Sequence, residues 1–441
     1  MSEAKIIGWN TYGEEIAASA ARISTTPGSA LELFEKAQER DDNGSLIAKV
    51  ISSGHRSVLE HMFVSIAFQN VSVYVEQFMI ECRLASFTVK SRRYVDFTNQ
   101  GFYTPPDLVG DALVFYRRYM QRAFQAYEKL LALDIPKEDA RFLLPYSFCS
   151  NFYCTLNARE LVRVVRDMQT GRGARMPELQ MLAQQLQLQI EAKMPFLVPE
   201  LNKPYCCNVE PFLMPLVQDG PEYVSGSALG KSEFRFGPRF EEVTEILSMA
   251  HRAAMGDDMY GGMDLRKLLN SDRPRELEML NYGFSVQDLT LAGLTHLTRH
   301  RMQSLIVPPL ENINYTRFVM PESIQSNSDA SYIYVGALEA AVGDIRTVAR
   351  DCVLKRYIPY FALSGNLIGT MTCMNARELL LFIKLRACNR AQWEIRQVAV
   401  NMLRELRQLY PTLFMLYGPS CYVTGVCPEG RMSCGKADEV R

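Results

Sequence analysis

Asn-Ala-Arg-Glu-Leu at residues 157–161 recurs unchanged at residues 375–379, and this repeat organises the 441-residue chain. Each copy follows a proline, Pro145 or Pro359, by ten or more residues, and each leads into an apolar segment with helical spacing. Repeated sequence at a long separation indicates a duplicated structural unit. We therefore predict two related domains, which also suits a chain too long for one ordinary core.

A second repeated segment supports the duplication. Arg83-Leu84-Ala85-Ser86 returns as Arg301-Met302-Gln303-Ser304. Between the copies, residues 219–237 are rich in glycine and serine and are flanked by proline, which favours a linker. The expected domains are residues 1–218 and 238–441, with a cysteine-containing tail at 420–441.

The apolar run at residues 289–297 ends in Arg299-His300-Arg301. Its spacing predicts a mostly buried helix with these three side chains at its end. Removing an unpaired guanidinium from water costs several kcal/mol, so the cluster suggests a bound anion or carboxylates from elsewhere in the fold. Cations that interact with the helix C-terminus and with water are the alternative.

Spacing predicts further elements along the chain. Residues 63–68 alternate as a strand does, and residues 111–133 and 240–255 have the periodicity of helices. The loop at 90–94, Lys-Ser-Arg-Arg-Tyr, could hold a phosphate through paired guanidinium groups and a hydroxyl, although basic surface loops are common.

The composition indicates a soluble globular protein, with 48% hydrophobic and 22% charged residues and a net charge of -1. Near-neutrality argues against nucleic acid as a partner, because such binding needs many phosphate contacts. We expect no membrane partner, because there is no signal segment and no apolar run of about 18 residues. A cytoplasmic location follows, and eleven cysteines there suit reduced thiols.

These motifs together resemble the flavin-dependent thymidylate synthases. The family pattern runs from a histidine-containing Glu-His start, through Gln and Arg-His-Arg-x-x-Ser, to a Ser-x-Arg-Tyr loop, Asn-Ala-Arg, Leu-Arg and Ala-Gln-x-Glu-Ile. The resemblance covers nearly the whole chain, once in each half. It implies an α+β fold in two copies, each with long helices packed on a small, mostly antiparallel sheet.

The resemblance also implies a reaction. Family members use FAD to transfer a one-carbon unit from methylenetetrahydrofolate to carbon 5 of deoxyuridylate, with NADPH as reductant, and they use no cysteine nucleophile. Cys82, which occupies a motif position, is therefore expected to be a buried and inert thiol.

The halves keep different parts of the pattern. The first half has Glu81-Cys82 where the family has Arg-His, and it loses Leu-Arg and Ala-Gln-x-Glu-Ile. The second half restores these motifs, with Leu385-Arg386 and residues 391–395, but it lacks the histidine-bearing start and has a longer loop at residues 307–312. The losses are largely complementary.

By resemblance, the functional residues divide into two groups. Those expected to bind the cofactor are Arg299, His300, Arg301, Asn157, Arg159, Asn375, Arg377 and His55. Those expected to bind the substrate are Gln77, Arg83, Ser86, Ser91, Arg93, Tyr94, Arg141, Arg386, Ser304 and Arg317.

Because the family forms homotetramers with sites between subunits, we expect a homodimer that acts as a pseudo-tetramer. One kind of site would join Ser91 and Arg93 to Arg386. The other would join residues 299–301 to Arg141 and the first Asn-Ala-Arg motif.

Three cysteines cluster in the tail, Cys421, Cys427 and Cys434, and could bind zinc or an iron–sulfur group. Structural zinc normally takes four ligands, so Cys206 or Cys207 would have to contribute. Reduced tail thiols are the alternative.

Two other functions stay open. The remodelled loop at 307–312 would allow the same flavin chemistry on a different pyrimidine. The departures at residues 81–82, Val89, Met168 and Lys355 would suit a non-catalytic protein that binds nucleotide or flavin.

Overall fold

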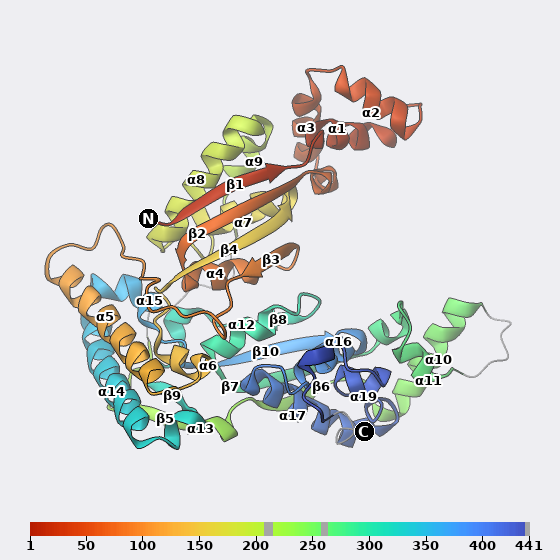
Figure 1. Ribbon diagram of the computed structural model, residues 1–441. Coiled ribbons are helices and arrows are strands. Elements are labelled where there is room, and N and C mark those ends of the chain that lie inside the picture. The colour runs from red at the N-terminus through yellow and green to blue at the C-terminus, as the bar shows by residue number, and fades with distance from the viewer. Residues whose placement is uncertain (207–214, 257–262, 437–441) are drawn as a thin grey trace. The chain divides into compact units, whose positions relative to one another are not determined.

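The computed structural model describes residues 1–206, 215–256 and 263–436, and it contains two four-stranded sheets with matching strand orders, β1-β2-β4-β3 and β6-β7-β10-β8 (Figure 1). Every pairing within these two sheets is antiparallel. The strands are β1 (Glu3–Trp9), β2 (Phe63–Ser72), β3 (Ala85–Val89) and β4 (Cys149–Asn157), and then β6 (Lys231–Phe236), β7 (Asn281–Thr290), β8 (Ser304–Ile306) and β10 (Leu367–Asn375). The predicted α+β fold in two copies is confirmed.

In both copies, helices lie between the same pairs of strands and after the last strand. The first copy contributes α1 (Gly13–Ile23), α2 (Ala30–Gln38), α3 (Asn43–Ser52), α4 (Val73–Ile80), α5 (Gly110–Ala132), α6 (Lys137–Ala140), α7 (Ala158–Thr170), α8 (Pro177–Lys193) and α9 (Val198–Leu201). The second contributes α10 (Phe240–Met255), α11 (Leu265–Leu269), α12 (Leu291–Thr298), α13 (Glu322–Gln325), α14 (Ser328–Arg350), α15 (Ile358–Phe361), α16 (Ala376–Arg386), α17 (Trp393–Leu409), α18 (Pro411–Phe414) and α19 (Ser420–Thr424). The helices expected at 111–133 and 240–255, and the strand expected at 63–68, are present.

Even a local irregularity is duplicated. Asn70 in β2 and Asp288 in β7 both have a left-handed backbone, with φ of 51° and 53°. The ladder register between β2 and β4 shifts between Phe68 and Val71, and the β7–β10 ladder also carries a shift. Such bulges bend a strand locally, so both copies bend at the same position.

Residues 219–237 are not a linker. They contain β5 (Glu222–Ser225), which pairs in parallel with β9 (Arg317–Met320), and β6, an outer strand of the second sheet. The glycines that suggested a linker lie at the turns around these strands. Gly230, with φ of 62°, immediately precedes β6.

The compact units are not continuous halves of the sequence. Unit 1 includes residues 343–362 from the second half, and unit 2 includes residues 133–142 from the first. In unit 1, the Tyr119 hydroxyl donates to the carbonyl of Phe361 at 2.7 Å. In unit 2, the indole of Trp393 donates to Asp139 at 2.8 Å. The exchanged segments are residues 133–142, directly after α5, and residues 343–362, which include the end of α14, and this differs from the predicted boundaries.

One short, fully buried helix lies in each unit, α4 in unit 1 and α12 in unit 2. All eight residues of α4 and all eight of α12 are buried. Burying a leucine side chain contributes about 1.5–3 kcal/mol, so α12, with Leu291, Leu294 and Leu297, is strongly held. In the part of the chain that the structure describes, no helix combines the length and apolarity needed to cross a bilayer.

The exchange predicts that a fragment of residues 1–218 will not fold as a monomer. It lacks residues 343–362, which include Tyr360, whose hydroxyl donates to Glu178 at 3.2 Å. We expect the isolated fragment to show no cooperative thermal unfolding by circular dichroism. Co-expression with residues 219–441 should restore it. A monomeric fragment that unfolds cooperatively would contradict this prediction.

Candidate functional site

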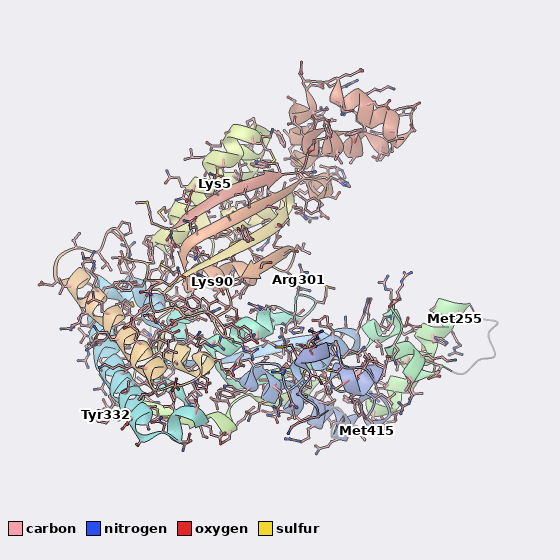
Figure 2. All side chains as sticks on the ribbon, viewed as in Figure 1. Lys5, Lys90, Met255, Arg301, Tyr332 and Met415 are labelled. Carbon is pink, nitrogen blue, oxygen red and sulfur yellow. The ribbon has the colours of Figure 1, made fainter. Side chains whose placement is uncertain are left out.

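The second copy places Arg299-His300-Arg301 at the end of the buried helix α12. Arg299 and Arg301 are exposed, whereas His300 is buried, with 5% of its surface accessible. Arg301, labelled in Figure 2, lies on the loop between α12 and β8. The two guanidinium groups therefore face outward from a turn that is held by the histidine between them.

His300 is held by hydrogen bonds from both ring nitrogens. Its Nδ1 lies 3.2 Å from Glu378 Oε1, and its Nε2 lies 2.9 Å from Arg386 Nε. Because an arginine can only donate, Nε2 accepts and Nδ1 carries the proton that is donated to the carboxylate. Burial lowers the pKa of His300, in spite of Glu378, and this supports the neutral ring. Phe382 packs edge-on against it at 4.9 Å.

A buried carboxylate holds the other end of α12. Glu394 accepts from the backbone nitrogen of Thr290 at 2.5 Å and from its hydroxyl at 2.6 Å, and Thr290 caps the helix. A Cβ added at Gly293 would lie 2.7 Å from the Glu394 carboxyl group, so only glycine allows this approach. Burial raises the pKa of Glu394 to about 7.

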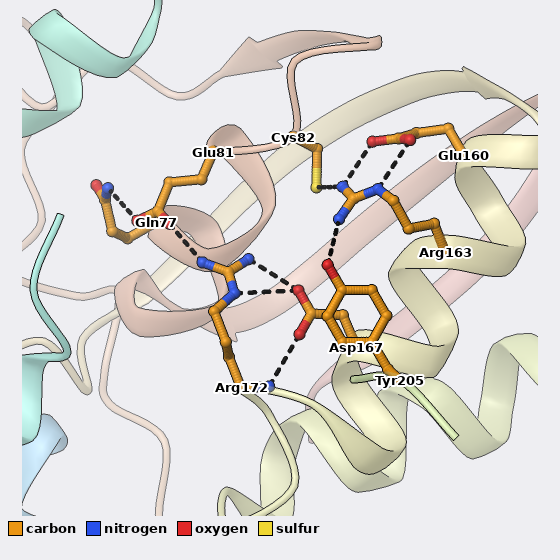
Figure 3. Close-up of polar contacts among 8 residues, drawn as sticks. All are labelled: Gln77, Glu81, Cys82, Glu160, Arg163, Asp167, Arg172 and Tyr205. Carbon is orange, nitrogen blue, oxygen red and sulfur yellow. Dashed lines mark hydrogen bonds and ion pairs between the residues drawn. The ribbon is translucent and has the colours of Figure 1, made fainter. Parts of the chain in front are cut away.

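The first copy fills the corresponding position differently (Figure 3). Cys82 occupies the place of His300, and Glu160 corresponds to Glu378. Arg163 binds Glu160 with two hydrogen bonds, of 2.9 and 2.6 Å, and donates to the Cys82 sulfur at 3.2 Å. An arginine from α7 thus replaces the imidazole as the partner of the glutamate in the repeated motif.

The residue equivalent to Arg299 is the acid Glu81, and it too has an internal partner. Arg172 bonds to Glu81 at 2.6 Å and to Asp167 at 2.9 and 3.1 Å, and its guanidinium lies 4.7 Å from the centre of the Phe78 ring. Gln77 donates to Glu81 at 3.0 Å. At this helix end, Glu81 and Asp167 share one arginine of the same unit (Figure 3).

Cys82 is buried as predicted. Burial raises the pKa of its thiol to about 12, which outweighs the opposing effect of Arg163. A thiol that stays protonated near neutral pH is a poor nucleophile.

The two Asn-Ala-Arg motifs have matching structural roles. Asn157 and Asn375 cap α7 and α16, each accepting from a backbone nitrogen three residues later at 2.9 Å. Arg159 pairs with Glu60, and Arg377 pairs with Glu278, both at 2.5 Å. Their place in the fold is therefore explained by capping and ion pairing.

In the basic loop of the first copy, Arg92 and Lys90 bind side chains of their own unit. Arg92 is buried and pairs with Glu76 at 2.6 Å, and Lys90 donates to Gln100 at 2.7 Å. Arg93 is half-buried and lies over the exposed ring of Tyr94, while the Ser91 hydroxyl accepts from the Arg93 backbone nitrogen at 3.4 Å. The loop therefore does not present its three cations as one cluster.

Two predicted substrate arginines have partners within unit 2. Arg317 lies between Glu222 at 2.9 Å and Asp288 at 2.8 Å. Arg141, which belongs to unit 2, is 2% exposed, and its charge acts on the buried Glu394. Neither guanidinium is presented as an open phosphate ligand.

The structure places the other predicted residues in separate settings. Arg386 lies beside His300 within unit 2. Gln77 is buried in α4. The exposed ones are His55, which precedes a 3-10 turn, Arg83, Ser86 in β3 and Ser304 in β8.

The tail cysteines are not gathered into a metal site. Among the described residues, no three His, Cys, Asp or Glu side chains are placed to hold a metal ion together. Cys434 accepts from Asn389 at 3.6 Å and is exposed. The proposed extra ligand Cys206 is exposed as well, while Cys207 lies outside the described residues.

Sequence reasoning missed two residues, Glu178 and Arg163. Glu178 accepts from the backbone nitrogen of Ser72 at 2.9 Å, as Glu394 does from Thr290, so the first copy keeps the glutamate of a motif that we predicted to be lost. Its neighbours differ, and only its position after the helix-starting Pro177 could have indicated it. Arg163 was missed because it replaces a leucine at the corresponding place in α16.

The described residues thus form a duplicated α+β fold, in which two exposed arginines, Arg299 and Arg301, flank His300 in the second copy. The family model for the thymidylate synthase complementing protein matches residues 5–196 and again 244–412. The chain therefore belongs to this family and is a flavin-dependent thymidylate synthase-like enzyme.

Individual relatives agree. The flavin-dependent thymidylate synthase of Geobacter sulfurreducens is 31% identical over 233 residues, covering 51% of this chain and 95% of the relative. That of Clostridium tetani is 34% identical over 199 residues, covering 40% of this chain and 78% of the relative. A solved structure of thymidylate synthase X from Helicobacter pylori, with FAD and dUMP, has a TM-score of 0.36 and 21% identity, and covers 46% of this chain and all of that one.

The raised pKa of Glu394 predicts a pH-dependent stability. Between pH 4.5 and 7 the folded protein binds a proton that the unfolded chain has released, so stability falls as pH rises through this window. Glu394→Gln should remove this dependence, which is on the order of 3 kcal/mol for the whole shift. Thermal unfolding midpoints of both proteins across this range will measure it. The exposed Glu241→Gln serves as control, and parallel profiles for wild type and Glu394→Gln would contradict the assignment.

Proposed function

We propose that this protein transfers a one-carbon unit from methylenetetrahydrofolate to carbon 5 of a deoxyuridylate-type nucleotide, with FAD as cofactor and NADPH as reductant. The names of the relatives and the motif residues support this reaction. The observation that carries it is the outward pair Arg299 and Arg301 on either side of a locked His300. A cytoplasmic location and a homodimer that acts as a pseudo-tetramer belong to the same proposal.

The arginine pair fits the diphosphate of FAD. Guanidinium groups bind phosphate oxygens through two parallel hydrogen bonds, and two of them can balance two negative charges. When bound, the flavin would supply the redox chemistry of the transfer. The chain's own contribution is to hold the turn. Glu378 and Arg386 fix the His300 ring, and the buried α12 fixes the backbone that carries both arginines.

The first copy keeps only one arginine of this pair, because Arg83 corresponds to Arg301. Its counterpart of Arg299 is Glu81, and Arg172 and Arg163 bind the nearby carboxylates. An anionic diphosphate there would have to displace these internal ion pairs. We therefore assign one FAD to each chain, held by the second copy.

Flavin binding tests this assignment. Purified protein should be yellow, with one FAD per chain, and the colour should bleach with NADPH. Arg299→Ala and Arg301→Ala should each weaken FAD binding about tenfold or more, since a charge-assisted hydrogen bond is worth about 1.5–3 kcal/mol. The exposed Arg266→Ala in the same unit should bind normally. A colourless protein that takes up no FAD would refute the flavin assignment, and two FAD per chain would refute its restriction to one copy.

Arg93 and Ser91 are the proposed ligands of the nucleotide phosphate. Arg93→Ala should weaken deoxyuridylate binding by about 1.5–3 kcal/mol in calorimetry, because one charge-assisted contact is lost. Arg117→Ala, an exposed arginine of α5, is the matched control. Equal affinity for all three proteins would remove Arg93 from the site.

The remodelled loop at 307–312 supports a second candidate, the same chemistry on another pyrimidine nucleotide. Here Glu311 is buried and Leu310–Asn312 form a 3-10 turn. Release of the carbon-5 hydrogen from labelled deoxyuridylate, compared with labelled uridylate, separates the two substrates.

A further inference from the structure

Unit 2 contains a pocket that the proposed reaction does not use. Its volume is about 960 Å³, and it lies between α17, α13 and the turn that leads into β6. It shares no residue with the Arg299–Arg301 turn or with the Ser91–Arg93 loop.

One wall of the pocket is a rigid indole. Trp393 is half-buried, its Nε1 donates to Asp139 at 2.8 Å, and its ring meets Phe142 edge-on at 6.2 Å. A Cβ at Gly226 would come within 3.3 Å of the indole edge, so the backbone there lies close to the ring. The indole is held on three sides and offers a flat surface to a ligand.

Three exposed cations line the same pocket, Lys231, Arg396 and Arg404. Within the described chain none of the three forms an ion pair, and Arg404 donates only to the amide of Asn401, at 3.2 Å. Of the two lining acids, Asp139 already accepts from Trp393 and from Ser323 at 2.6 Å, and burial raises its pKa. Glu322 is therefore the lining acid that remains to offset the charge of the three cations.

The spacing of the cations selects for an extended anion. Arg396 and Arg404 are eight residues apart on α17, which corresponds to about 12 Å along a helix. Val400, halfway between them, also lines the pocket, so all three lie on one face. A single phosphate ion would contact one arginine, whereas a polyphosphate chain could reach both.

The first copy shows that the scaffold does not need these charges. Glu405 accepts from Phe234 of β6 at 2.7 Å, just as Gln189 accepts from Ile6 of β1 at 2.8 Å, which aligns α17 with α8. With this alignment and the matching β1–β2 and β6–β7 registers, the positions of Lys231, Trp393, Arg396 and Arg404 hold Glu3, Pro177, Gln180 and Leu188. The aromatic wall and every cation belong to the second copy alone.

We propose that this pocket binds a small ligand that combines a planar ring with several phosphates, the chemistry of a nucleoside polyphosphate. The ring would lie on Trp393, and the phosphates would extend along α17 to Arg396 and Arg404, with Lys231 as a third cation. Stacking on an aromatic surface and charge-assisted hydrogen bonds are each effective in such recognition.

Tryptophan fluorescence can report on this pocket directly, because the chain contains only two tryptophans. In full-length protein carrying Trp9→Phe, Trp393 is the sole emitter. Titration with ATP should change its fluorescence saturably. Arg396→Gln and Arg404→Leu, which copy the first-copy residues, should each weaken ATP binding about tenfold, as expected for loss of a charged contact of about 1.4 kcal/mol. Arg252→Gln, an exposed arginine of α10, should leave binding unchanged.

Further titrations separate the pocket from the flavin and nucleotide sites. Tripolyphosphate should compete with ATP and adenosine should bind much more weakly, while saturating FAD or deoxyuridylate should not displace ATP. The proposal is overturned if ATP leaves the fluorescence unchanged, if the two arginine variants bind as wild type does, or if deoxyuridylate displaces ATP. These outcomes do not depend on whether the protein synthesises thymidylate.

Discussion

A buried carboxylate at the start of a buried helix is the contact on which each copy of this fold depends. The first turn of a helix leaves backbone N–H groups without partners, and in the interior no water can satisfy them. Glu394 accepts from Thr290 ahead of α12, and Glu178 accepts from Ser72 ahead of α4. The carboxylate thus holds the start of the buried helix, and in the second copy Arg299-His300-Arg301 follow at its other end.

The two copies have the same backbone arrangement at that helix end, but the side chains there differ in charge. In the second copy a neutral imidazole satisfies Glu378, so Arg299 and Arg301 can remain on the surface. In the first copy Arg163 satisfies Glu160. The buried glutamate needs a partner in each copy, but that partner can be a histidine in one and an arginine in the other.

Much of the site could be anticipated from single residues, but their partners could not. The motif spacing located His300 and the outward arginines, because helical periodicity places residues after an apolar run at a helix end. It did not show that Arg92 forms an ion pair with Glu76, or that Arg317 forms ion pairs with Glu222 and Asp288. Those acids lie in distant or unrelated segments. The sequence does not distinguish an arginine that binds a ligand from one that binds an internal carboxylate.

The sequence by itself determined the family, the duplication and the type of each main element, because these follow from repeated motifs and from local periodicity. Only the tertiary structure decided that residues 133–142 and 343–362 are exchanged between units, that residues 219–237 form strands, and that Glu178 repeats the role of Glu394. Each of these depends on contacts between residues far apart in the chain. Such contacts are set by burial and by the need to pair every buried polar group, which local sequence does not record.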